Sequence, residues 1–251
     1  MRAVSPDLMA GDHEGTAPPL PLYSYAFQPI VDANVREIFS FEALIRGPNG
    51  ESAGAVMSLV SGASLGRLDR DGRVAAVMLA GELGLSCNLN LNVLPQNVRA
   101  SDADLDSLLC ASQRWDIAPD RLILEVTEGE AIDDIARFAT AIDEYRAVGV
   151  KVAIDDFGAG YSGLNLLADF QPDVIKLDMN LIRNIESRGP RQSIVRAVCS
   201  VCEDLGIDVI AEGVETLAEF DWLSGEGVHF FQGYLFARPG FAALPLATYP
   251  R

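Results

Sequence analysis

Residues 151–160 read Lys-Val-Ala-Ile-Asp-Asp-Phe-Gly-Ala-Gly, a short, largely apolar run followed by two carboxylates and two glycines. Such a run is typical of a strand buried in a parallel sheet. Consecutive side chains of a strand point to opposite faces, so Asp155 and Asp156 can reach one site only where the backbone turns. Gly158 and Gly160 permit such a turn. On its own, this stretch fits a polar turn with a helix cap as well as it fits a functional site.

The same arrangement recurs along most of the chain. A carboxylate, amide or lysine side chain stands where successive predicted strands end, at positions 42–46, 92, 125–128, 176–178, 211–215 and 231–236. A barrel of parallel strands gathers these ends at one rim, where such folds carry their active sites. Oxygen ligands in this number, with no His or Cys among them, suit hard divalent cations. The pattern predicts a metal-dependent enzyme that acts on an anionic substrate.

The predicted elements indicate an α/β barrel. Residues 23–31 and 37–45 are expected to form two strands joined by the turn 32–34, and so short a connection favours an antiparallel hairpin. Helices then alternate with strands, as in a (β/α)8 barrel, which typically needs about 250 residues. Further strands are predicted at 87–92, 122–126, 151–154, 174–177, 207–211 and 228–231, and helices at 52–61, 65–83, 102–114, 132–148, 162–168, 216–223 and in segments up to 205.

Composition and charge exclude several classes of protein. The formal net charge of −17 disfavours binding to a nucleic-acid polymer, because such binding depends on clustered Lys and Arg. The longest apolar run, 74–80, is far shorter than the roughly 20 residues that a membrane span needs. Residues 1–21 lack an apolar segment and are expected to form a flexible tail, while 22–251 form one domain. We therefore expect a cytoplasmic protein without membrane contact.

Five longer motifs occur in a fixed order along the chain. They are Glu-Ala-Leu-x-Arg at 42–46, Asp-Asp-Phe-Gly-x-Gly at 155–160, Lys-Leu-Asp at 176–178, Ala-Glu-Gly-Val-Glu at 211–215 and Gln-Gly-Tyr-Leu-Phe at 232–236. Together they resemble the EAL domains, which are bacterial phosphodiesterases that open cyclic di-GMP to linear pGpG. The resemblance covers residues 23–239 and implies a modified TIM (β/α)8 barrel with one antiparallel strand. This fold agrees with the predicted hairpin.

The resemblance implies a ligand set for two Mg²⁺ or Mn²⁺ ions, with Asp155 shared between them. The implied metal ligands are Glu42, Asn92, Glu125, Asp155, Asp156 and Glu212. Glu212 would act as ligand or general base, while Lys176 and Gln232 would position the attacking water. Ca²⁺ is expected to inhibit, because it is larger than Mg²⁺ and prefers looser coordination.

Substrate and loop residues are also implied by the resemblance. Cyclic di-GMP would be bound by Gln28, Leu44, Arg46, Asp178 and Glu215, with Arg46 on a phosphate. Glu128 matches the residue that anchors the loop 156–164, which in this family couples dimerisation to metal binding. A homodimer is therefore expected, whereas the sequence identifies no regulatory protein partner.

The sequence leaves two alternatives open. Many EAL domains have a serine two residues after the metal-binding Asn, where this chain has Leu94. Asn90 and Asn92 are therefore both candidate ligands, and Asn92 fits better as the last strand residue before Pro95. The alternative function is a catalytically silent EAL module that binds cyclic di-GMP or a protein partner as a regulator. Silent members typically lack a metal ligand, whereas every expected ligand type is present here, which favours the active enzyme.

Overall fold

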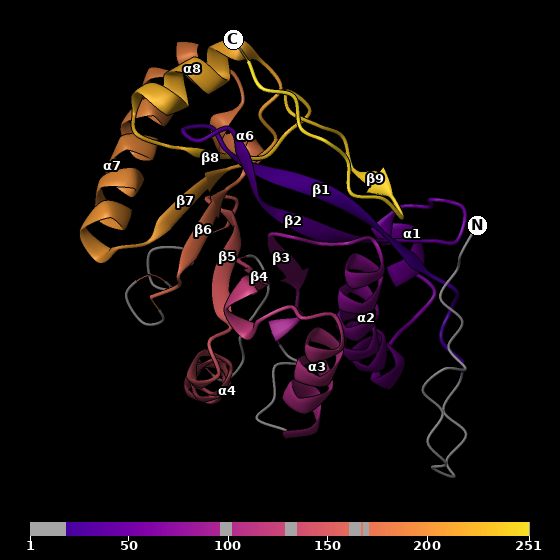
Figure 1. Cartoon of the computed structure of the whole chain (residues 1–251). Coiled ribbons are helices and arrows are strands. Elements are labelled where there is room, and N and C mark those ends of the chain that lie inside the picture. The colour runs from indigo at the N-terminus through magenta and orange to yellow at the C-terminus, as the bar shows by residue number, and fades with distance from the viewer. Residues whose placement is uncertain (1–18, 96–101, 129–134, 161–166, 168–170, 251) are drawn as a thin grey trace.

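The computed structural model describes residues 19–95, 102–128, 135–160, 167 and 171–250. These residues form a closed barrel of eight strands (Figure 1). The strands are β1 (Ser24–Asp32), β2 (Glu37–Arg46), β3 (Asn88–Asn92), β4 (Leu122–Thr127), β5 (Lys151–Phe157), β6 (Val174–Leu177), β7 (Asp208–Ala211) and β8 (Phe230–Phe231). From β2 to β8 each strand is parallel to the next, and β1 closes the barrel antiparallel to both β2 and β8. The predicted fold class and its antiparallel hairpin are confirmed.

A further strand, β9 (Gly240–Phe241), pairs antiparallel with Ala26 and Phe27 of β1. The sequence did not predict it, because two residues are too few to show the alternation that marks a strand.

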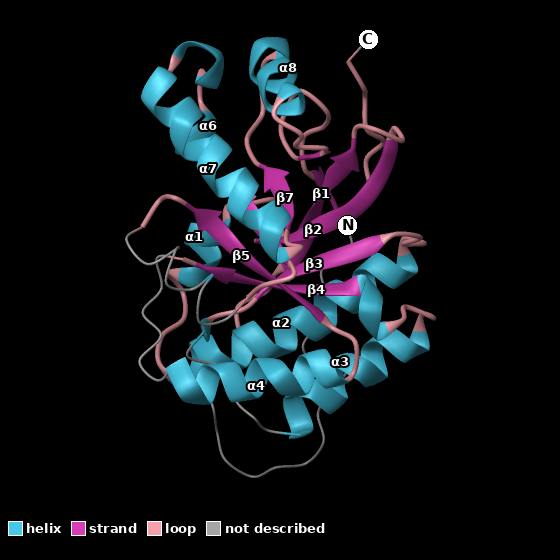
Figure 2. Ribbon diagram, turned by 90° about the vertical axis from the view of Figure 1, so that its left-hand side faces the viewer, coloured by secondary structure: helices cyan, strands magenta, loops and turns pink. Residues whose placement is uncertain are grey.

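Helices cover the outside of the barrel. They are α1 (Ala53–Met57), α2 (Ala63–Glu82), α3 (Asp102–Arg114), α4 (Ile135–Ala147), α6 (Met179–Ile182), α7 (Gly189–Leu205) and α8 (Leu217–Gly225). Figures 1 and 2 show α2 and α3 together on one side of the strands, with α7 and α8 on the other. The helix predicted at 162–168 lies, apart from residue 167, outside the described residues, as do residues 1–18 of the predicted tail.

Two apolar layers hold the barrel together. The larger layer lies between the strands and the helices that cover them. The smaller one fills the barrel interior with one residue from each of six strands, namely Ile30, Ile123, Ala153, Val174, Ile210 and Phe230. These side chains form an apolar layer, called the floor below, and the polar groups of the rim lie directly next to it. Within the described part of the chain, no helix has the length and apolar composition to cross a membrane.

Candidate active site

The floor of the barrel determines which side chains meet at the rim. Strand side chains two residues apart share a face, so the residue two positions beyond each interior apolar residue also points inward. On five strands this pairs Ile123 with Glu125, Ala153 with Asp155, Val174 with Lys176, Ile210 with Glu212, and Phe230 with Gln232. On β2 the buried Ser40 precedes Glu42 in the same way. These six predicted site residues therefore form one polar layer next to the apolar residues of the barrel interior.

Lys176 lies at the centre of this layer, with its side chain only 1% exposed. Its Nζ is 2.5 Å from Glu212 Oε1, 2.8 Å from Glu125 Oε1, 3.1 Å from Asp155 Oδ1 and 3.4 Å from Glu42 Oε2. Burial lowers the pKa of Lys176, but the surrounding carboxylates raise it well above its usual value. The side chain is therefore an ammonium ion that four carboxylates share.

One ammonium does not neutralise this group of carboxylates. Burial raises the pKa of Glu125 well above its usual value, and the nearby Glu42 and Asp155 raise it further. Burial likewise raises the pKa of Glu212, with Asp155 as a further cause. Burial also acts on Glu42, but Lys176 and two amide donors lower its pKa below the usual value. Protons thus compete for the site when no other cation is present.

Amide side chains fix two of these carboxylates. Gln232 Nε2 donates to Glu42 Oε2 at 2.7 Å, and Asn92 Nδ2 donates to Glu42 Oε1 at 3.2 Å. Asn90 Nδ2 donates to Glu125 Oε1 at 2.7 Å from a fully buried position. Both Asn residues of β3 therefore reach the site, Asn90 deep in the barrel and Asn92 at its exposed rim.

Asp155 and Asp156 point to one site because the backbone turns at Asp156. Its φ of 55° is left-handed, and the pairing of β5 with β6 shifts register between Ile154 and Phe157. The turn expected after β5 therefore begins at the second aspartate itself, and Gly158, with φ of 95°, continues it. Burial raises the pKa of Asp156 to about 6, with the neighbouring Asp155 as the next cause.

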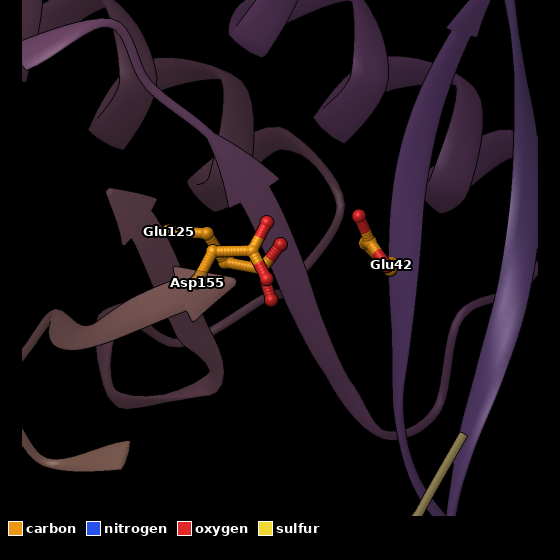
Figure 3. Close-up of side chains that lie close together, drawn as sticks. All are labelled: Glu42, Glu125 and Asp155. Atoms are coloured by element: carbon orange, nitrogen blue, oxygen red, sulfur yellow. The ribbon is translucent and has the colours of Figure 1, made fainter. Parts of the chain in front are cut away.

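The carboxylates fall into two groups that share Asp155. One group is Glu42, Glu125 and Asp155, and the other is Asp155, Asp156 and Glu212. Within each group the candidate ligand atoms lie within 4.8 Å of one another. Figure 3 shows the first group, whose carboxylates approach one another from β2, β4 and β5.

The residues of this site fit divalent cations. Among the described residues, Glu125 Oε2 is a buried oxygen that accepts no hydrogen bond, and such an atom needs another partner. Five carboxylates and one or two amide oxygens are the ligands that Mg²⁺ and Mn²⁺ prefer. The described residues thus offer oxygen ligands for two cations, with one carboxylate between them.

The predicted substrate residues divide into two sets. Gln28 is opposite Glu42 in the β1–β2 pairing, and half-buried Leu44 and Arg46 follow Glu42 at two-residue spacing toward the end of β2. These three side chains lie around the rim. Asp178 instead accepts a hydrogen bond from the Asn180 amide at the start of α6, at 2.9 Å.

Glu215 and Glu128 also have partners within the protein. Glu215 forms a 3.1 Å ion pair with Arg183 and is about half exposed. Glu128 Oε2 accepts hydrogen bonds from the backbone amides of Gly158 at 2.6 Å and Gly160 at 3.4 Å. Glu128 therefore contacts the predicted loop 156–164 where it leaves β5, although residues 161–164 lie outside the described residues.

Comparison with known proteins gives relatives of two kinds. The blue light- and temperature-regulated antirepressor BluF of Escherichia coli is 36% identical over 227 residues, which are 90% of this chain and 56% of BluF. The cyclic di-GMP phosphodiesterase PdeR of E. coli is 41% identical over 116 residues, 46% of this chain and 18% of PdeR. The chain thus spans about half or less of the length of these curated relatives.

Solved structures share the fold. A standalone EAL protein from Vibrio cholerae O395, in its c-di-GMP bound form, has a TM-score of 0.87 at 44% identity, covering 90% of this chain and 95% of that one. The calcium and cyclic di-GMP complex of Klebsiella pneumoniae BlrP1 has a TM-score of 0.87 at 40% identity, covering 97% and 61%. A manganese complex of BlrP1 with the same nucleotide has a TM-score of 0.85 at 41% identity, covering 96% and 61%.

These likenesses extend over the barrel that carries the carboxylates. The EAL domain matches residues 22–239, from two residues before β1 to the residue before β9. Motif order, barrel topology and family match agree, and the chain belongs to the EAL domain family.

Proposed function

We propose that the chain hydrolyses cyclic di-GMP to linear pGpG with two divalent cations, Mg²⁺ or Mn²⁺, bound at the barrel rim. The observation that carries the proposal is the charge imbalance of the site, where the described residues place five carboxylates around one ammonium, that of Lys176, which contacts four of them. Two divalent cations would balance this excess and convert an acidic rim into one that attracts a phosphodiester. EAL proteins that bind cyclic di-GMP with calcium or manganese support the choice of substrate.

The two carboxylate groups indicate which residues would hold the cations. Glu42, Glu125 and Asp155 would hold one together with Asn92, and Asp155, Asp156 and Glu212 would hold the other. When bound, two divalent cations lower the pKa of a shared water and take up the charge that develops on the phosphate oxygens.

The remaining residues would orient the nucleophile and the substrate. Lys176 remains protonated at neutral pH and can hold the attacking oxygen, while Glu212 beside it can receive the proton. Gln232 keeps Glu42 in place through its 2.7 Å hydrogen bond. At the end of β2, Arg46 can pair with a phosphate of the substrate through two parallel hydrogen bonds.

A second candidate function is regulation through a protein partner. It is favoured by the 36% identity to BluF, whose name describes an antirepressor. In that case the chain would bind the nucleotide or a protein without hydrolysis. The complete carboxylate set distinguishes the two functions, because binding alone does not need a second group of cation ligands.

A turnover assay tests the proposal. The purified chain is incubated with cyclic di-GMP and Mg²⁺ or Mn²⁺, and the products are separated by chromatography. We expect pGpG only when the cation is present, no product in excess chelator, and inhibition by Ca²⁺. Undiminished turnover in chelator would exclude the metal mechanism, and nucleotide binding without product would favour the regulator.

Lys176→Ala separates the role of the ammonium from substrate binding. If Lys176 holds the nucleophile, this variant lowers kcat more than it weakens binding of cyclic di-GMP. A change in substrate affinity with normal kcat would contradict the role.

The proposal includes a cytoplasmic homodimer whose interface lies near the loop that Glu128 holds. Specific activity is measured over a dilution series while light scattering reports the mass. A protein that stays monomeric and fully active at every concentration would exclude the requirement for a dimer.

A further inference from the structure

A buried ion pair lies outside the carboxylate cluster, on α2. Arg73 Nη1 is 2.5 Å from Asp69 Oδ2, one helical turn away, and both side chains are only 5% exposed. Removing two charges from water is costly, so a buried pair contributes little to stability by itself. The role of this pair is therefore better explained by the group that it holds in place.

Asp69 uses its second oxygen to bind the chain just after β3. The backbone amide of Leu94 donates to Asp69 Oδ1 at 3.1 Å, and Leu94 is two residues beyond Asn92. The amide of Val93 donates to the Glu125 carbonyl at 2.9 Å, and Pro95 has no amide hydrogen. Between Asn92 and Pro95 the backbone thus has two donors, and Asp69 accepts one of them.

Asp69 itself is firmly placed. Arg73 also lies close to Tyr145 of α4, because burial raises the pKa of that tyrosine and the charge of Arg73 lowers it. The adjacent Gly72 lets α2 approach β1 closely, because a Cβ there would lie 2.6 Å from the Tyr25 hydroxyl. The Asp69–Arg73 pair therefore lies where α2, α4 and β1 meet.

We propose that Asp69 is a positioning residue for Asn92. By accepting the Leu94 amide it fixes the turn that follows Asn92, and thereby the direction of the Asn92 side chain. The Asn92 amide group donates an N–H to Glu42 Oε1, so its Oδ1 is the atom that would face a cation. The inference rests on the proposed function, since it concerns a ligand of the first cation group. Asp69 would thus raise the affinity for a divalent cation without contacting either the ion or the substrate.

Calorimetric titration of the full chain with MnCl₂, without substrate, tests this role. Asp69→Ala is expected to weaken Mn²⁺ binding by about 10-fold, as the loss of groups that orient metal ligands typically does. Asp69→Asn keeps an oxygen that can accept the Leu94 amide, so its loss should be smaller. Hydrogen exchange of the 93–94 segment should become faster in Asp69→Ala, because the Leu94 amide loses its acceptor.

Asp104→Asn is the matched control. Asp104 forms a 3.2 Å ion pair with Arg70, which ties α2 to α3, whereas the Leu94 amide donates to Asp69. This variant should keep the wild-type affinity for Mn²⁺.

The outcomes separate positioning from general stability. A lower melting temperature of Asp69→Ala with unchanged Mn²⁺ affinity would overturn the inference, and so would an equal loss in Asp104→Asn. If Asp69→Ala does not fold, Asp69→Asn is measured by both methods, and faster exchange of the Leu94 amide with unchanged Mn²⁺ affinity would overturn the inference. Wild-type protein that binds no Mn²⁺ would instead refute the proposed metal site itself.

Discussion

Glu125 and Glu219 are both buried glutamates, yet the protein surrounds them with opposite chemistry. Glu219 is 1% exposed, and its carboxylate accepts the backbone amides of Asn184, Glu215 and Thr216 at 3.0–3.1 Å. Burial raises the pKa of Glu219, but these three amides lower it below its usual value. Glu125 is equally buried, and its pKa is raised well above the usual value by burial and by neighbouring carboxylates.

The difference shows which carboxylate serves the fold and which serves the site. Glu219 completes a capping box with Thr216 at the start of α8, so every oxygen has a partner that folding itself provides. Glu125 has one oxygen on Lys176 and another that accepts no hydrogen bond among the described residues. A buried carboxylate left unsatisfied in this way is costly unless a cation binds it. Glu219 therefore belongs to the scaffold, whereas the unsatisfied oxygen of Glu125 supports the proposal that a cation binds there.

Glu125→Gln should give the largest effect on activity. The substitution keeps the volume and removes the charge, so we expect kcat/KM to fall by roughly 10³-fold, or about 4 kcal/mol of transition-state stabilisation. The free energy of unfolding in chelator should not fall, because the substitution removes one of the mutually repelling carboxylates around Lys176 and leaves the other three. Steady-state kinetics and thermal unfolding in chelator measure both quantities. Near-normal activity of the folded variant would show that Glu125 is not part of the site.

Glu219→Ala should do the reverse. It removes the acceptor of three backbone amides and the capping box, which should lower the free energy of unfolding by about 3 kcal/mol. For a chain of this size the melting temperature should fall by roughly 6–12 °C. At temperatures well below the melting temperature of the variant, its Mn²⁺ affinity and turnover should stay close to those of the wild type. Glu219→Gln, which keeps one acceptor, is the control and should lose less stability.

Added metal should distinguish the two glutamates by thermal stability alone. A ligand that binds only the folded state at about 100 times its Kd adds about 2.7 kcal/mol to the free energy of unfolding. We expect Mn²⁺ to raise the melting temperature of wild type and of Glu219→Ala, and chelator to reverse the gain. Glu125→Gln should gain much less. An equal gain in all three proteins would show that Mn²⁺ binds elsewhere.

The barrel and most of its rim could be predicted because both follow from short-range patterns. Strands such as Leu122–Thr127 begin with an apolar run, and the candidate site residue, here Glu125, follows that run. Two-residue spacing along parallel strands then brings Glu125, Asp155, Lys176 and Glu212 together whatever the details of the helices. The short turn between β1 and β2 likewise determines the antiparallel hairpin.

Features that depend on distant contacts or on unusual backbone could not be predicted. The left-handed conformation of Asp156 has no sequence marker, because such conformations favour glycine and two glycines follow closely. The capping box of Thr216 and Glu219 is different, because it has a local sequence marker, a Thr followed three residues later by Glu. The contact between Asp69 and the Leu94 amide joins segments 25 residues apart, and no local sequence pattern predicts it.

Glu128 combines features of Glu219 and Glu125, and its substitution should have the smallest effect on Mn²⁺ affinity. Its carboxylate accepts two backbone amides, as Glu219 does, but those amides belong to the loop that leaves Asp156. Without Glu128, the backbone turn at Asp156 loses two hydrogen bonds that hold it. Glu128→Ala should therefore weaken Mn²⁺ binding by about 10-fold, or 1.4 kcal/mol, although Glu128 would not contact the ion itself. Glu128→Gln keeps an acceptor for the Gly158 amide and should retain most of the affinity. Titration of both variants with MnCl₂ measures the effect. If Glu128→Ala loses stability as Glu219→Ala does while its Mn²⁺ affinity is unchanged, Glu128 is a scaffold residue and the loop does not set the position of Asp156.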